Sequence, residues 1–102
     1  MGSNDTGEKE AVVDDTVIAS AAETQKVDGY HYFAPETVNW DLLEKSSRTS
    51  VCPWKGVATY YDVVVDGKRH PAAAWTYADA SEAAASIRGH VAFWRGVRSV
   101  KD

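Results

Sequence analysis

Short apolar runs separated by two-residue turn signals dominate the first third of the chain. Two pairs of such runs predict two antiparallel hairpins. The second turn contains glycine, which accepts a positive φ without steric cost and therefore specifies the turn more strongly. The predicted hairpins are residues 10–13 with 16–20 around Asp14-Asp15, and residues 25–27 with 30–33 around Asp28-Gly29.

The best-specified element is a longer hairpin, in which residues 56–65 and 68–77 flank Asp66-Gly67. A two-residue turn at that point makes the numbers of facing residues sum to 133, so that each pair sets a large side chain against a small one. Pro71 removes one ladder donor, which predicts an edge position or a bulge that shifts the register by one residue. The predicted pairs are Gly56 with Tyr77, Ala58 with Trp75 and Tyr60 with Ala73, and the side chains predicted to point inward are Tyr60, Trp75 and Tyr77.

The remaining segments predict short elements of both kinds. Alternation over residues 38–43 predicts a half-buried strand, and the polar residues 46–50 predict a loop. Residues 80–87 favour a helix, capped by Asp79 with Glu82 and ended by Gly89. Residues 91–94 and 97–100 then predict two strands joined around Arg95-Gly96. The sequence therefore predicts a mainly β, antiparallel fold with one short helix near residues 80–88.

The length of 102 residues fits one domain, in which residues 1–10 are predicted to be a disordered polar segment and residues 11–102 a single β-rich fold. Four tryptophans, five tyrosines and two phenylalanines are a large apolar contribution for a domain of this size. We therefore expect a core that needs neither a metal nor a disulfide.

Charge and cysteine content narrow the setting. The net charge of −4 argues against general nucleic-acid binding, although Arg88, Arg95, Arg98 and Lys101 form either a solvated basic face or an anion site. The single cysteine cannot form an intramolecular disulfide, which is typical of a reducing, cytoplasmic compartment. We expect no membrane partner, because no apolar segment approaches the length of a membrane span. The pattern does not indicate an oligomeric state.

Candidate chemistry gathers at residues 52–61, where Cys52, Trp54 and Lys55 lead into the long hairpin. Lys55 is either an ammonium presented to an anionic ligand or a lysine whose stem covers Trp54. Cys52 is either a thiolate activated by Lys55 or a packed small side chain. Glu23 is a carboxylate partner of Lys55, an acid–base group in a pocket or an exposed strand charge. His31 is either a catalytic base or a structural histidine beside an aromatic ring.

Three classes of function remain compatible with these residues. The leading one is a small-molecule binding module, in which the sheet presents Trp54, Lys55, Tyr60 and Trp75 around an anionic or planar ligand. The second is an enzyme that uses Cys52 or Lys55 with Glu23 or His31. The third is a protein-interaction module that uses a sheet edge. The candidate ligand-binding residues are Glu23, His31, Cys52, Trp54, Lys55, Tyr60, Trp75 and Tyr77.

Several motifs together resemble the domain of unknown function 427 family. They are Val-Ile-Ala at 17–19 with Glu23, His-Tyr-Phe-x-Pro at 31–35, Cys-Pro-Trp-Lys-Gly-x-Ala-x-Tyr-Tyr at 52–61, Ala-Ala-Trp-x-Tyr at 73–77 and Val-Ala-Phe-Trp at 91–94. The resemblance implies a compact β-tent of two antiparallel sheets and a cytoplasmic setting, but no chemistry.

The nucleotidyltransferase-like label of that family does not agree with these residues. Nucleotidyl transfer needs clustered carboxylates that hold a divalent metal, and the aspartates of this chain fall at predicted turns and strand exteriors. Zinc sites of other β-tent domains use paired cysteines, whereas this chain has one. We therefore expect no metal site and no cofactor.

Overall fold

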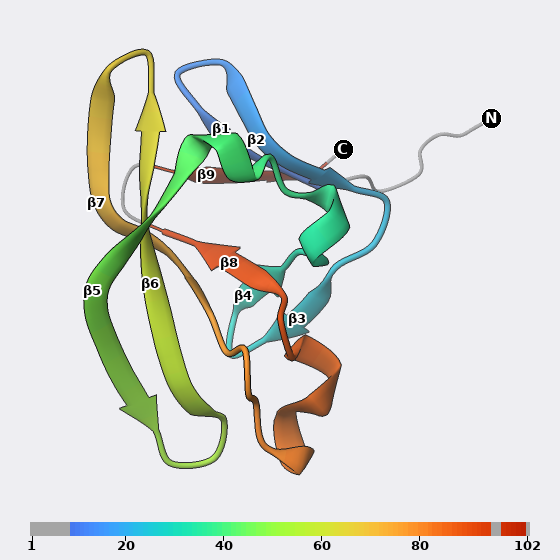
Figure 1. The fold of residues 1–102 in the computed structure, drawn as a ribbon. Helices are drawn as coiled ribbons and strands as arrows, with labels where there is room; N and C mark the ends of the chain where they lie inside the picture. The colour runs from blue at the N-terminus through green and yellow to red at the C-terminus, as the bar shows by residue number, and fades with distance from the viewer. Residues whose placement is uncertain (1–8, 95–96, 102) are drawn as a thin grey trace, which may run out of the picture.

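The computed structural model describes residues 9–94 and 97–101, and antiparallel strands make up most of them (Figure 1). The mainly β prediction is confirmed. The strands are β1 Lys9–Val13, β2 Thr16–Ala21, β3 Gln25–Val27, β4 Tyr30–Tyr32, β5 Leu43–Cys52, β6 Gly56–Val65, β7 Lys68–Thr76, β8 Val91–Phe93 and β9 Arg98–Lys101. Three short 3₁₀ helices join them, namely η1 Pro35–Thr37, η2 Trp40–Leu42 and η3 Glu82–Ile87.

Within the described residues these strands form two larger sheets, ordered β2-β1-β9 and β5-β6-β7-β8, and a separate β3-β4 hairpin. The β1–β2 and β3–β4 hairpins are confirmed, with β1 beginning at Lys9. Residues 1–8, most of the segment predicted to be disordered, lie outside the described residues, as does the predicted joint at Arg95-Gly96. The strands on either side of that joint belong to different sheets, since β8 pairs with β7 and β9 pairs with β1.

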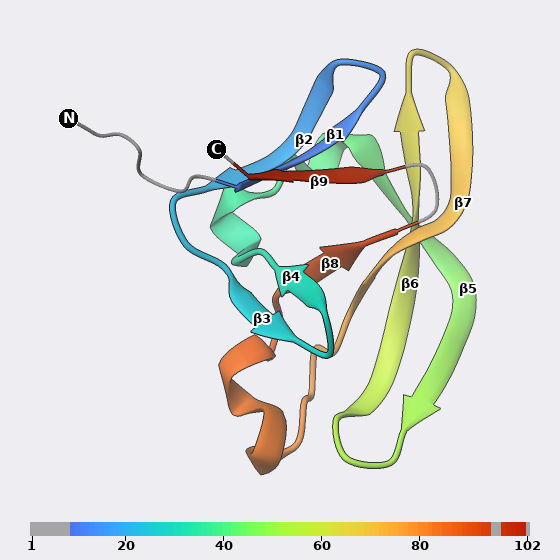
Figure 2. The same ribbon diagram turned by 180° about the vertical axis from the view of Figure 1, so that it is seen from behind.

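The β3–β4 hairpin is held against the larger sheet by backbone hydrogen bonds. Phe33 and Val91 exchange both N–H···O=C bonds at 2.8 Å, which fixes the end of β4 beside β8. Figure 2 shows the hairpin lying in front of β8, with η3 below it. Residues that are distant in the sequence thus meet on one side of the β5-β6-β7-β8 sheet.

The β6–β7 pairing is confirmed. The predicted register is correct next to the Asp66-Gly67 turn and wrong on the other side of the bulge. Val65 faces Lys68 as expected, whereas Tyr60 faces Trp75 instead of Ala73. The bulge predicted at Pro71 is present, but it adds two residues to β7 instead of one. A shift of two leaves the same side chains pointing inward, because alternate residues share a face. Two large rings therefore lie directly opposite each other, with Trp75 buried and Tyr60 partly buried.

A carboxylate stabilises this bulge. Asp62 accepts a hydrogen bond from the backbone N–H of Ala72 at 2.8 Å and one from Arg69 at 2.7 Å. Ala72 has a φ of +51°, an uncommon conformation for a residue with a side chain. The Ala72 N–H bond and the Arg69 guanidinium hold the pKa of Asp62 below its usual value. This contact between β6 and β7 thus stabilises the bulge, and the bulge sets the register between Tyr61–Ala74 and Thr59–Thr76.

Two predicted local elements are wrong. Residues 38–43 do not form one strand, because Trp40 to Leu42 turn into η2, where the Asn39 side chain accepts the Asp41 N–H. The predicted loop at 46–50 lies inside β5, an edge strand whose residues are mostly exposed and, over this stretch, polar. The predicted helix is the 3₁₀ helix η3, kinked at Ala84 and preceded by Ser81 instead of Asp79.

Among the described residues the core forms two clusters, which share the β5-β6-β7-β8 sheet. One contains Ile18, Phe33 and Phe93 together with valines and alanines of both larger sheets. The other contains Tyr32, Trp75, Tyr77 and Ile87, with small alanines beneath the rings. No helix among the described residues is long and apolar enough to cross a membrane. Three rings of the second cluster, Tyr32, Trp75 and Tyr77, also line the candidate site.

Candidate functional site

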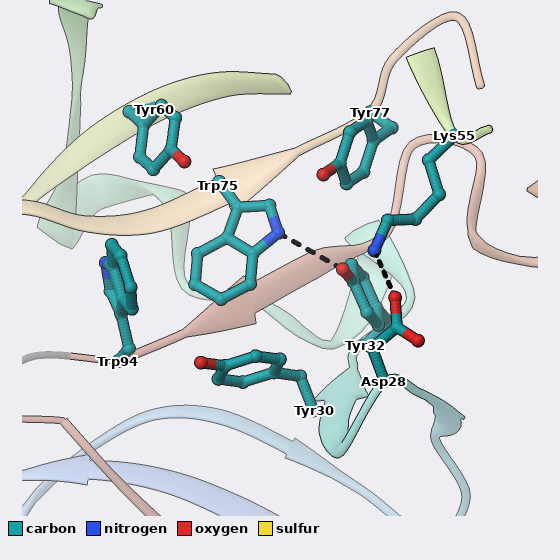
Figure 3. Close-up of a pocket in the computed structure, with 8 residues that line it drawn as sticks. All are labelled: Asp28, Tyr30, Tyr32, Lys55, Tyr60, Trp75, Tyr77 and Trp94. Carbon is teal, nitrogen blue, oxygen red and sulfur yellow. Dashed lines mark hydrogen bonds and ion pairs between the residues drawn. The ribbon is translucent and has the colours of Figure 1, made fainter. Parts of the chain in front are cut away.

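A pocket of about 250 Å³ opens beside the second core cluster, and aromatic rings form most of its walls (Figure 3). Its residues come from the β3–β4 hairpin, from the turn before β6, and from β6, β7 and the segments that follow β7 and β8. They are Asp28, Tyr30, Tyr32, Lys55, Tyr60, Trp75, Tyr77 and Trp94.

The turn that carries Lys55 is fixed by contacts with the segment before η3. The Lys55 carbonyl accepts the Ser81 N–H at 3.0 Å, and the Trp54 carbonyl accepts the Ser81 hydroxyl at 2.6 Å. Gly56 follows with a φ of +118°, which side-chain-bearing residues rarely adopt, and a Cβ there would lie 3.5 Å from the Asp79 carbonyl. The backbone therefore directs Lys55 inward, although lysine is mostly exposed in proteins.

Lys55 forms an ion pair with Asp28 in which the two partners differ in exposure. The Lys55 ammonium lies 2.6 Å from the Asp28 carboxylate, and the side chains are 9% and 55% exposed respectively. Burial lowers the pKa of Lys55, but the Asp28 hydrogen bond and the Coulombic attraction to Asp28 and to the ionised forms of Tyr32 and Tyr77 outweigh it, so the net pKa is raised. At neutral pH the site therefore presents a buried, charged ammonium.

Rings surround that ammonium on two sides. Its nitrogen lies 5.2 Å from the centre of the Trp54 ring and 5.5 Å from that of Tyr77, distances at which aromatic faces attract a cation. Trp54 is 44% exposed and covers the ammonium from outside the pocket. Asp28 is the one hydrogen-bond partner that the described residues give this ammonium, which leaves two of its three N–H donors for water or a ligand.

Trp75 is the centre of the aromatic wall. Its ring meets Tyr30 edge-on with centroids 5.0 Å apart and Trp94 with centroids 5.3 Å apart. Its indole N–H donates to the Tyr32 hydroxyl at 3.2 Å, so the Tyr32 O–H remains able to donate. Burial raises the pKa of both Tyr32 and Tyr77, which keeps both hydroxyls protonated at neutral pH. The wall thus offers ring surface together with O–H donors.

The structure brings four predicted residues to this pocket, namely Lys55, Tyr60, Trp75 and Tyr77. Cys52 packs against the same core cluster, partly buried and with a free thiol, but it does not line the pocket. The list of candidate residues lacked Asp28, Trp94 and the tyrosines of β4. For Asp28 and the two tyrosines, the signal in the sequence was their place in or beside the Asp28-Gly29 turn. The structure shows that this turn lies opposite the motif that carries Lys55.

Glu23 and His31 lie apart from the pocket lining. The Glu23 side chain is exposed, and Asp28 takes the place beside Lys55 that was predicted for Glu23. The Nδ1 atom of His31 shares a hydrogen bond of 2.7 Å with the Thr24 hydroxyl, which agrees with a structural histidine. Among the basic residues near the chain end, Arg88 donates to the Ala80 carbonyl, whereas Arg95 and the side chains of Arg98 and Lys101 lie outside the described part.

The site can bind more readily than it can react. A lysine nucleophile must lose its proton, and the raised pKa of Lys55 opposes that step. In residues 9–94 and 97–101 no three histidine, cysteine or carboxylate side chains gather as a metal-binding group. A fixed cation, two O–H donors and ring surfaces are groups suited to holding a planar anion.

The pocket should make the protein sensitive to alkaline pH. Lys55, Tyr32 and Tyr77 all have raised pKa values, so the folded state keeps protons that the unfolded chain has already lost. Their stabilisation is complete below about pH 10 and declines as the pH rises through the folded-state values. Urea denaturation between pH 8 and about 11.5 should show this decline. Tyr77→Phe should make it shallower, Tyr61→Phe outside the pocket is the control, and a flat profile would contradict the assignment.

Fold and site together define a small antiparallel β domain with an aromatic-lined pocket that contains the Lys55–Asp28 ion pair. The family described as "Domain of unknown function (DUF427)" matches residues 6–101, and the chain belongs to this family. The resemblance seen in the sequence motifs is therefore confirmed. A comparison with curated proteins finds no match.

Proposed function

We propose that this domain is a small-molecule binding module whose pocket takes a small planar organic anion. The observation that carries the proposal is the buried Lys55, held charged in an open pocket lined by aromatic side chains. Burying a lysine costs free energy, and folding gains little from a pair whose partner is half exposed. A bound anion that pairs with the Lys55 ammonium would offset this cost and would explain why the charge is buried.

The dimensions favour a compact ligand. The pocket volume of about 250 Å³ corresponds to roughly eight water molecules of liquid, slightly below the usual range for drug-sized ligands. A single aromatic ring with one charged substituent, with about nine non-hydrogen atoms, suits this space. Rings of Trp75 and Tyr60 offer it edges and faces for offset contact.

The proposal includes a setting. We propose a cytoplasmic protein with the β-tent arrangement that the family resemblance implies, and without nucleic-acid or membrane partners. The free, partly buried Cys52 supports a reducing compartment, and the net charge of −4 supports the absence of nucleic acid. The two larger sheets support the β-tent arrangement.

Titration with benzoate tests the proposal, because two of the four tryptophans line the pocket and the others do not. In ¹H–¹⁵N NMR spectra, the indole signals of Trp75 and Trp94 should shift in a saturable way, with a dissociation constant on the order of 1 mM. Trp40, on the exposed 3₁₀ helix η2, is the internal control. Unchanged Trp75 and Trp94 signals, or equal shifts at Trp40, would contradict binding in this pocket.

A further inference from the structure

We propose that the ligand is a small planar carboxylate, and that its carboxylate takes the place of Asp28 on the Lys55 ammonium. This inference rests on the proposed function and names the class of ligand and the residue that competes with it. The Asp28 carboxylate then competes with the carboxylate of the ligand for the Lys55 ammonium, and this competition weakens the binding of anions.

The two members of the ion pair are held very differently. Lys55 is fixed by the Ser81 contacts and nine-tenths buried, whereas Asp28 reaches it from a hairpin turn with its side chain 55% exposed. The Lys55 bond is the one hydrogen bond that the described residues give the Asp28 carboxylate. Gly29, with a φ of +86°, follows it in the turn. Rotation of the Asp28 side chain into water therefore breaks one contact and leaves the backbone turn in place.

Donors remain in the pocket that Asp28 does not use. The Tyr32 hydroxyl accepts the Trp75 N–H and keeps its own hydrogen, and the Tyr77 hydroxyl has no hydrogen-bond partner among the described residues. Figure 3 shows both hydroxyls on the same side of the pocket as the Lys55 nitrogen. A carboxylate has two oxygens and about four acceptor positions, so it can accept from Lys55 and from a tyrosine together.

The charge of the pocket favours a monoanion over a phosphate. Among the described residues that line it, Lys55 is the one cation, and no arginine offers a bidentate contact. Phosphate groups carry more charge and are typically bound by several donors from arginine, lysine or helix N-termini. The Lys55 ammonium already donates to a carboxylate oxygen, that of Asp28, at 2.6 Å, so a ligand carboxylate suits the same donor.

A pair of isosteric probes and a pair of matched variants test the inference. Benzoate and benzamide have the same shape and differ in charge. Asp28→Asn removes the competing carboxylate, while Asp66→Asn makes the same change in the corresponding Asp-Gly turn of the β6–β7 hairpin, away from the pocket. Dissociation constants come from the Trp75 indole signal, and thermal melts with each probe report stabilisation.

Benzoate should bind wild-type protein about tenfold more tightly than benzamide, and Asp28→Asn should strengthen benzoate binding about tenfold further. Benzoate should also raise the melting temperature of Asp28→Asn more than that of the wild type or Asp66→Asn. No gain for benzoate in a folded Asp28→Asn would overturn the inference while leaving the pocket an anion-binding site. Equal binding of the two probes to the wild type would overturn the preference for an anion, on which the inference and the proposed function both rest. Binding of neither probe to either protein would overturn the proposed function itself.

Discussion

Trp75→Ala is expected to lower the free energy of unfolding by about 3–5 kcal/mol, the usual cost of removing a large core aromatic. Trp75 is 6% exposed and contacts the rings of Tyr30, Tyr32, Tyr60 and Trp94. Its loss leaves a void between the β3–β4 hairpin and β7 that the fixed backbone cannot fill. Urea denaturation followed by circular dichroism measures the change.

Trp54→Ala is the matched control for this prediction. Trp54 is also a tryptophan of the site region, but it is 44% exposed and lies outside the pocket lining. Its replacement should cost about 1–2 kcal/mol, clearly less than that of Trp75, because nearly half of the Trp54 surface is already in water. Similar losses in the two variants would mean that Trp75 is not the centre of the second core cluster.

The two halves of the ion pair should differ in their effect on stability. Asp28→Asn leaves a nine-tenths buried ammonium without its counter-ion, which we expect to cost about 1–3 kcal/mol. Lys55→Met keeps the apolar stem and leaves a half-exposed carboxylate that water can solvate, so it should cost less than about 1 kcal/mol.

Denaturant midpoints and slopes at pH 7 measure both variants in the same way. Losses of equal size would indicate an ordinary surface salt bridge whose partners are solvated alike. A larger loss for Lys55→Met than for Asp28→Asn would make Lys55 a structural residue and would remove the main support for a ligand site.

Hairpins whose turns contain Asp-Gly were predictable from the sequence, since the turn alone specifies which strands pair. The inner register of β6 and β7 was not, because it depends on the Asp62 carboxylate binding the Ala72 N–H across the strands. The same limit applies to η3. Its alanines favour an α-helix. The backbone carbonyl of Tyr77, however, accepts the N–H groups of both Ala80 and Gly89, and the short segment closed by these two bonds forms 3₁₀ turns.

The candidate site was predictable where one motif carries it. Lys55 stood out because a lysine between a tryptophan and a glycine gains little on a surface, and the structure places it in the pocket. Asp28 did not stand out, because its role as a turn residue already explained it and 27 positions separate it from Lys55. Glu23 was favoured instead from the family resemblance, which names residues without placing them.

Lys55 is the residue proposed to attract the ligand, and benzoate titration of Lys55→Met tests this role most directly. Lys45→Met, which removes an exposed lysine of β5, is the control. In a folded Lys55→Met protein the Trp75 indole should respond to benzoate at least about tenfold more weakly than in the wild type, and Lys45→Met should match the wild type. Unchanged benzoate affinity in Lys55→Met would contradict the account.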